Sequence, residues 1–190
     1  MKITNTVKTI KLLAILFISA LTFTACSEDD HDDHDDHDHE EELITTVNYT
    51  LTSGSDVVTL TYRDLDGEGG NEGVTTVSGS LSANTTYAGA IELLNETESP
   101  AENMTEEIEE EDDEHEFFFT STVTGLTISK TDVDGDGNPL GLETSLASGA
   151  AGSGSITIVL KHEPTKPNDG TSASAGGSTE LEVTFNVTVQ

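Results

Sequence analysis

The sequence ELEVTFNVTV at residues 180–189 alternates strictly between polar and apolar side chains. Successive side chains of a β-strand point to opposite faces, so this period of two is typical of a strand that buries one face and exposes the other. Shorter runs of the same kind, rich in Val, Ile and Thr, recur from residue 44 onward. We therefore expect a domain at residues 43–190 that is built mainly of strands.

Eight further segments have the composition of strands and are separated by polar or glycine-containing turns. The order strand, acidic loop, strand, turn, strand occurs twice, which predicts an internal repeat at about residues 44–98 and 115–165. Alternatively, the two halves share only a Thr- and Gly-rich composition. Two similar halves and the closing strand predict an all-β fold, namely an Ig-like β-sandwich. The eight segments are residues 44–51, 56–62, 74–81, 85–94, 116–120, 126–130, 142–147 and 155–161.

One short acidic helix is expected between the two halves. Ser99 is the expected N-cap and Pro100 the first helical residue, and the side chains of Met104 and Ile108 would face the core. The acidic residues that follow oppose the helix, because like charges stack on its surface and lie at its negative end. Residues 161–178, which contain two prolines and two consecutive glycines, are expected to form a long loop.

The charge of the chain excludes some classes of partner. It has 37 acidic and 7 basic residues, a formal net charge of −30. Such a field repels nucleic acids and attracts cations, so nucleic acid is excluded as a partner and divalent cations are favoured. The sequence contains no nucleophile motif, phosphate-binding loop or HExxH motif, so we do not expect an enzyme.

A twelve-residue segment, DVDGDGNPLGLE at residues 132–143, has acids at alternate positions and a glutamate at its end. Short carboxylates at alternate positions can converge on one ion, a glycine permits the sharp turn, and the final glutamate adds two oxygens. The segment resembles the calcium loop of EF-hand proteins, although its flanks have the pattern of strands. The alternative is a polar hairpin connection, because Asp-Gly is itself a turn signal. The expected Ca²⁺ ligands are Asp132, Asp134, Asp136, Asn138 through its carbonyl group, and Glu143.

The corresponding loop of the first half is a weaker candidate for the same ion. Asp64, Asp66 and Glu68 occupy its three acidic positions. Thr75 stands at the twelfth position and cannot close the site with two oxygens.

Residues 26–42, CSEDDHDDHDDHDHEEE, combine a dense acidic run with four histidines. Low hydrophobicity and high charge predict a disordered tether. Imidazole suits Zn²⁺, Cu²⁺ and Ni²⁺, and carboxylates neutralise the charge of such ions. His31, His34, His37 and His39 are therefore expected to capture a transition metal ion. The alternative is a soluble spacer whose histidine content is incidental.

His115 and His162 are the two histidines outside this tract. Together with Glu106, Glu109 or Glu110 they would form a folded transition-metal site if the ends of their two strands meet. The alternative is that each is a solvated residue at the end of a strand.

The histidine tract follows an apolar leader that we exclude from the fold. Residues 1–25 contain three lysines and a largely apolar run at residues 12–23, which is too short to span a bilayer and typical of a signal peptide. The run ends LTFTAC, which resembles the lipobox of bacterial lipoproteins and implies that Cys26 is acylated and anchors the chain to a membrane. The acids at residues 28–30 resemble the export signal of Bacteroidetes-type surface lipoproteins, which implies the outer membrane and the cell surface. If these acids are only a spacer, the periplasmic face is the alternative.

The acidic tract, the Asp-rich loop and the segments LGLET and LKHEP, at residues 140–144 and 160–164, resemble a family of small flavobacterial surface lipoproteins. That family is sometimes labelled as having a type 1 periplasmic-binding fold, but this chain lacks the alternating strand–helix units of that fold. The resemblance and the motifs predict a lipid-anchored envelope protein that captures a divalent transition metal for uptake through an outer-membrane receptor or for buffering, with a calcium-stabilised β-domain. The alternative is a structural or adhesive calcium-binding β-sandwich on an acidic stalk.

Overall fold

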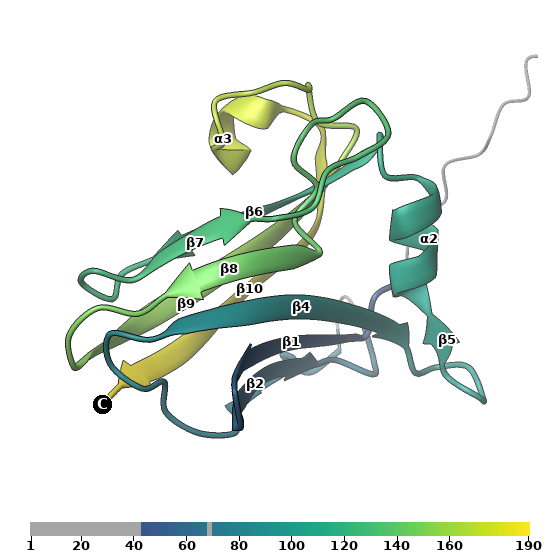
Figure 1. Cartoon of the computed structure of the whole chain (residues 1–190). Helices are drawn as coiled ribbons and strands as arrows, with labels where there is room; N and C mark the ends of the chain where they lie inside the picture. The colour runs from purple at the N-terminus through teal and green to yellow at the C-terminus, as the bar shows by residue number, and fades with distance from the viewer. Residues whose placement is uncertain (1–42, 68–69) are drawn as a thin grey trace, which may run out of the picture. The chain divides into compact units, whose positions relative to one another are not determined.

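The computed structural model describes residues 43–67 and 70–190. The leader, Cys26, the four histidines of the tract and Glu68 lie outside these residues, so the predictions for them stay predictions. The described residues form two antiparallel sheets and two short helices, α2 (Met104–Glu110) and α3 (Ser172–Ala175) (Figure 1). No helix among these residues is both long and apolar enough to cross a bilayer.

The larger sheet has seven strands and the smaller sheet has three. In the larger sheet the order is β3-β2-β1-β4-β8-β7, and β5 pairs with the end of β4. The order in the smaller sheet is β10-β9-β6. The bounds are β1 Thr46–Ser53, β2 Asp56–Arg63, β3 Val74–Val77, β4 Thr86–Asn95, β5 Glu102–Asn103, β6 His115–Ser121, β7 Thr127–Lys130, β8 Glu143–Ala147, β9 Gly152–His162 and β10 Ser178–Val189.

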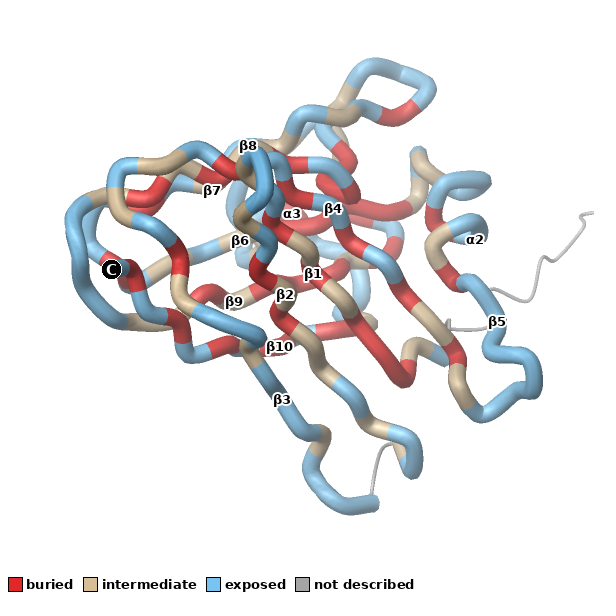
Figure 2. The backbone as a smooth tube through the Cα atoms, turned by 60° about the horizontal axis from the view of Figure 1, so that its bottom comes forward, coloured by how far each residue is buried: buried red, intermediate tan, exposed pale blue. Residues whose placement is uncertain are grey.

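One apolar core joins the inner faces of both sheets. Every second residue of β10 from Leu181 to Val189 is buried, as the alternation in the sequence predicts. Buried and exposed positions alternate in the same way along β4 (Figure 2). Across the core, the ring of Tyr49 on β1 lies 5.8 Å from that of Phe119 on β6. The prediction of an all-β, sandwich-like fold is confirmed.

The two halves of the predicted repeat pair their strands in similar ways. In the first half β1 pairs with β4 and β2 with β3, and in the second half β6 pairs with β9 and β7 with β8. The halves differ in their placement, because β7 and β8 join the larger sheet while β6 and β9 belong to the smaller one. The repeat itself stays a prediction.

The helix between the halves begins later than predicted. Its N-cap is Asn103 instead of Ser99, and the Asn103 side chain accepts a hydrogen bond from the backbone N–H of Thr105. The physical reason is β5, whose pairing with the end of β4 keeps residues 102–103 extended. Met104 and Ile108 are buried as predicted. A second helix, α3, lies within residues 161–178, where only a loop was expected.

Candidate metal centre

The ends of β6 and β9 meet, and this brings the two histidines outside the N-terminal tract together. His115, the first residue of β6, lies directly opposite His162, the last residue of β9, in the antiparallel register. Both side chains are buried. Their rings stack with centroids 4.9 Å apart and planes 12° from parallel. The prediction that these histidines share a site depended on this meeting of the strand ends.

Glu180 on β10 completes the group. The register between β10 and β9 shifts between Thr179 and Leu181, so Glu180 is the extra residue of a β-bulge. A regular strand would point Glu180 away from the face that carries Leu181, but a bulge redirects the side chain. The Glu180 side chain is almost completely buried, with Oε1 3.4 Å from Nδ1 of His162 and Oε2 3.5 Å from Nε2 of His115.

A backbone carbonyl fixes the protonation of His115. Nδ1 of His115 lies 3.0 Å from the carbonyl oxygen of Glu111, the C-cap of α2. Because a carbonyl oxygen can only accept, Nδ1 carries the hydrogen, and the neutral ring then presents its Nε2 lone pair to the carboxylate of Glu180. Nε2 is therefore the ring nitrogen of His115 that is available to a cation or to a second proton. Either one would give the carboxylate of Glu180 a positive partner.

The separations in this group fit a metal ion better than they fit ion pairs. Charge-assisted N–H···O hydrogen bonds are about 2.7–2.9 Å long, whereas the two histidine nitrogens lie 3.5 and 3.4 Å from the Glu180 oxygens. Ligand atoms arranged tetrahedrally at about 2.0–2.1 Å from an ion are about 3.3 Å from one another. The hydrogen bond from His115 to Glu111 is the support that metal-bound histidines commonly have. The buried histidines and Glu180 can therefore hold a metal ion.

Two further carboxylates lie on the outer side of His162. Oε2 of Glu114 lies 3.4 Å from Nε2 of His162, and the backbone N–H of Glu163 donates to the carbonyl oxygen of Glu114 at 2.7 Å. Glu163 has a φ of 50°, in the left-handed region that glutamate seldom adopts. Glu114, His162 and Glu163 offer ligand atoms that all lie within 4.8 Å of one another.

The glutamates predicted to join the histidines are not the ones that do. The metal-ligand groups among the described residues contain Glu114, Glu163 and Glu180, whereas the prediction named Glu106, Glu109 and Glu110. The three predicted glutamates belong to α2, whose C-terminal end supplies only the Glu111 carbonyl. Glu114 and Glu163 are chain neighbours of the two histidines, and that adjacency could have indicated them. No sequence signal marks the bulge that turns Glu180 inward.

The loop predicted to bind calcium is held by a lysine. Nζ of Lys166 donates to Oδ2 of Asp134 at 3.0 Å, and the backbone N–H of Asn138 donates to Oδ1 at 2.7 Å. Burial opposes ionisation of Asp134, but the hydrogen bonds from Lys166 and Asn138 outweigh it and lower the pKa of this carboxyl group to about 2. A Ca²⁺ ion at Asp134 would have to displace the Lys166 ammonium group.

The other acids of this loop do not converge on one point. The two oxygens of Asp132 accept the backbone N–H groups of Gly141 at 2.8 Å and Glu143 at 3.1 Å. The side chains of Asp136 and Glu143 are exposed. Among the residues that the structure describes, the metal-ligand groups include no member of this loop. The calcium prediction stays a prediction. The geometry observed is that of a polar connection whose acids accept hydrogen bonds from its own backbone.

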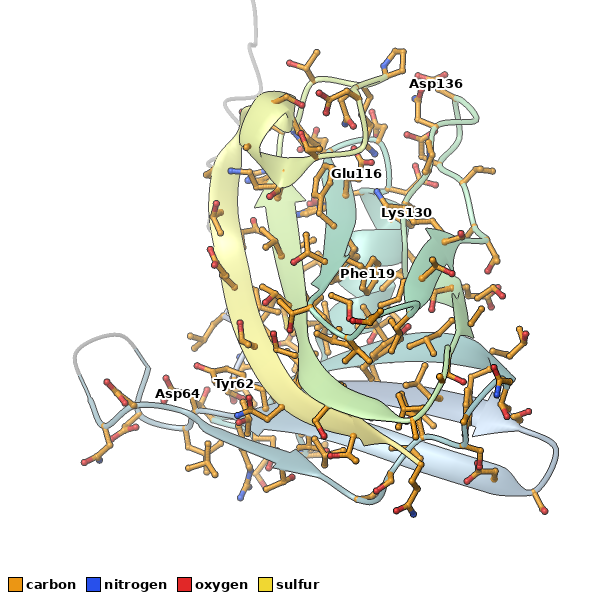
Figure 3. All side chains as sticks on the ribbon, turned by 90° about the vertical axis from the view of Figure 1, so that its left-hand side faces the viewer. Tyr62, Asp64, Glu116, Phe119, Lys130 and Asp136 are labelled. Carbon is orange, nitrogen blue, oxygen red and sulfur yellow. The ribbon has the colours of Figure 1, made fainter. Side chains whose placement is uncertain are left out.

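In the corresponding loop of the first half, the acids also accept hydrogen bonds from the backbone of the loop. Oδ1 of Asp64 accepts the N–H groups of Asp66 and Gly67. The backbone and side-chain hydrogen bonds from Asn71 lower the pKa of Asp66. Figure 3 shows Asp64 and Asp136 far apart, so the two acidic loops do not form one site.

Two of the cations of the domain line one pocket beside the loop of residues 132–143. The pocket has a volume of about 220 Å³ and is lined by Lys130, Lys166, Glu116 and Asn168, among others. Lys130 forms an ion pair with Glu116, near the same end of the fold as Asp136 (Figure 3). Burial lowers the pKa of Lys130, and the pairing with Glu116 acts in the opposite direction. These lysines neutralise buried acids that would otherwise be available to bound cations.

No family model, curated protein or solved structure matches the chain. The resemblance to surface lipoproteins therefore stays a prediction.

Proposed function

We propose that this chain is a lipid-anchored envelope protein that captures a divalent transition metal ion and retains it at His115, His162 and Glu180. The observation that carries the proposal is the hydrogen bond between Nδ1 of His115 and the Glu111 carbonyl group. It directs the Nε2 lone pair of a buried histidine at a buried carboxylate 3.5 Å away. A metal ion between these groups would be bound by both, and the Glu111 carbonyl group would support His115 as a ligand.

The ligand types favour Zn²⁺ over Ca²⁺ or Mg²⁺. Two imidazoles and one carboxylate suit zinc and its neighbours, whereas calcium takes six to eight oxygen ligands and magnesium an octahedron of oxygens. Three protein ligands leave a fourth position open, which is typical of zinc sites that exchange a ligand. The negative charge of the chain raises the local concentration of any divalent cation.

The N-terminal tract is proposed to act as a collector. Its four histidines and many acids can bind transition metals without a preformed geometry, so it would hold ions weakly and exchange them quickly. The buried group of His115, His162 and Glu180 would hold one ion more tightly, because its ligands are already in place. Delivery to an outer-membrane receptor and buffering of excess metal both fit this division of roles.

The test is a calorimetric titration with Zn²⁺ of the chain from residue 26 onward, with Cys26→Ser in place of the lipidated residue. A tract variant, in which the histidines at positions 31, 34, 37 and 39 become asparagine, should keep one tight site per chain. With the tract unchanged, Glu180→Gln should weaken the tight site by at least about tenfold, because loss of a ligand costs no less than loss of an outer-shell partner. The weak binding of the tract should stay in place. Glu182→Gln makes the same change of charge at an exposed position of β10 and should match the wild type.

Two results would overturn the proposal. One is the loss of all zinc heat in the tract variant, which would leave no role for the folded site. The other is identical tight binding by Glu180→Gln and Glu182→Gln, which would show that the buried carboxylate is not a ligand.

A further inference from the structure

His162 contacts a carboxylate with each of its two ring nitrogens. Nδ1 lies 3.4 Å from Oε1 of Glu180, and Nε2 lies 3.4 Å from Oε2 of Glu114. Glu180 belongs to the inner site with His115, and Glu114 belongs to the outer group with Glu163. The imidazole ring of His162 therefore stands between two sets of metal ligands.

Exposure falls steeply from the outer set to the inner one. The side chain of Glu114 is 35% exposed and that of His162 is 8% exposed. The side chains of Glu180 and His115 are 1% and 0% exposed. An ion from solvent therefore meets the outer carboxylates before it can reach the inner ligands.

A neutral imidazole has one lone pair, and this limits how the two sets can be filled. When Nε2 of His162 binds an ion at the outer set, Nδ1 carries the hydrogen and can donate it to Glu180. When Nδ1 binds an ion at the inner set, Nε2 carries the hydrogen and can donate it to Glu114. In both states the ring nitrogen that does not bind the ion is supported by a carboxylate, as in many histidine–metal sites.

We propose that Glu114, Glu163 and Nε2 of His162 form an outer site through which a divalent transition metal ion reaches and leaves the buried site of His115, Glu180 and Nδ1 of His162. This inference rests on the proposed function. The transfer leaves the number of ring protons unchanged, because the hydrogen moves from Nδ1 to Nε2 of His162 as the ion moves inward. One ion occupies the pair of sites at a time.

The backbone around Glu163 is built to place this outer carboxylate. The left-handed conformation of Glu163 turns the chain at the end of β9, and its N–H group is bonded to the Glu114 carbonyl oxygen. Gly177 packs so closely against this turn that a Cβ atom there would lie 2.1 Å from the carbonyl oxygen of His162. Residues in sparsely populated conformations persist only where the surrounding structure holds them, and they are frequent at functional sites.

The test measures the rates of Zn²⁺ uptake and release by stopped-flow competition with a fluorescent chelator. All chains carry the tract substitutions, so that the fast exchange of the tract does not mask the folded site. Glu163→Gln should slow uptake and release on the order of tenfold, and Glu114→Gln should slow uptake by a similar factor. The equilibrium affinity of Glu163→Gln should stay within about twofold, because loss of a transit site changes both rates by the same factor. Glu114→Gln should also bind the ion more weakly, because the Nε2–H group of His162 then loses its carboxylate acceptor. Glu182→Gln, with the same change of charge, should keep the wild-type rates.

Three results would overturn the inference. Unchanged rates in both variants would mean that ions do not pass the outer carboxylates. Weakened affinity of Glu163→Gln caused by faster release alone would make Glu163 a permanent ligand of the bound ion. Binding of two zinc ions by the folded site would mean that both sets are filled together. If the wild-type folded site binds no zinc at all, the proposed function falls with this inference, whereas the other three results leave it standing.

Discussion

A single lysine pairs with the buried acid of the loop at residues 132–143. Four acids in that loop suggest a cation, and the structure supplies one from the chain itself, Lys166, whose ammonium group bonds to the buried carboxylate of Asp134. Lys166 also donates to the carbonyl oxygen of Asp112, so it links the loop to the segment that follows α2. The partner of Asp134 lies 32 residues away in the sequence, and no local motif could have indicated it.

The ion pair of Asp134 predicts a specific sensitivity to acid. Its folded-state pKa is about 2, below the ordinary value of 3.8. The ionised carboxylate therefore contributes stability that is fully present above about pH 4 and is lost as the pH falls towards 2. Asp134→Asn should be less stable than the wild type at pH 6, and the gap should narrow steadily below pH 4. Urea unfolding followed at a series of pH values measures this gap.

A control in the same loop separates Asp134 from the general effect of protonating many acids. Asp136 is exposed, and Asp136→Asn should follow the wild-type stability at every pH. A gap between Asp134→Asn and the wild type that stays constant from pH 6 to pH 2 would contradict the role given to the ion pair.

At the level of elements, strands were predictable and their irregularities were not. Alternation over residues 180–189 predicts β10 because burial on one face repeats every two residues. The bulge at Glu180 interrupts that alternation where two strands pair, which is a property of the pair and not of either sequence. The candidate metal centre was only partly predictable for the same reason. The histidines were identified as candidates, but the carboxylate that joins them could not be.

The start of α2 also depends on strand pairing, which the local sequence does not reveal, and this can be tested. Asn103 caps the helix by accepting the N–H of Thr105, and its side-chain amide donates to Glu106 at 2.9 Å. Asn103→Ala should lower the free energy of unfolding by about 1 kcal/mol, the usual cost of losing an N-cap. Ser99→Ala, at the position predicted from sequence, should change it by less than about 0.5 kcal/mol. Urea unfolding at neutral pH compares the two. Equal losses, or a larger loss for Ser99→Ala, would contradict the observed cap.

For the whole molecule, the negative charge bears on the candidate metal centre. The chain has 37 acids and 7 bases, and self-repulsion among like charges destabilises a compact state. Within the described residues, Lys130, Lys166 and Arg63 each pair with a carboxylate, so they offset only part of this charge. A divalent ion held by β6, β9 and β10 would add positive charge where the three strands of the smaller sheet come together.

Zinc should therefore stabilise the folded domain as a whole. An ion that binds only the folded state stabilises it by about 2.7 kcal/mol at a free concentration one hundred times its dissociation constant. For a domain of this size that is a rise of roughly 5–12 °C in the melting temperature. The rise should occur in the tract variant, whose unfolded chain has fewer histidines to bind zinc. It should fall to about half or less when Glu180→Gln is added to that variant, because a site at least about tenfold weaker keeps at most about 1.4 kcal/mol of the stabilisation. Differential scanning calorimetry with zinc, calcium or a chelator measures it.

Calcium at the same concentration should have little effect. A calcium-dependent rise that persists in Glu180→Gln would instead place a bound ion in the loop of residues 132–143. A zinc-dependent rise of equal size in both chains would contradict the buried site, because Glu180 would then play no part in holding the ion.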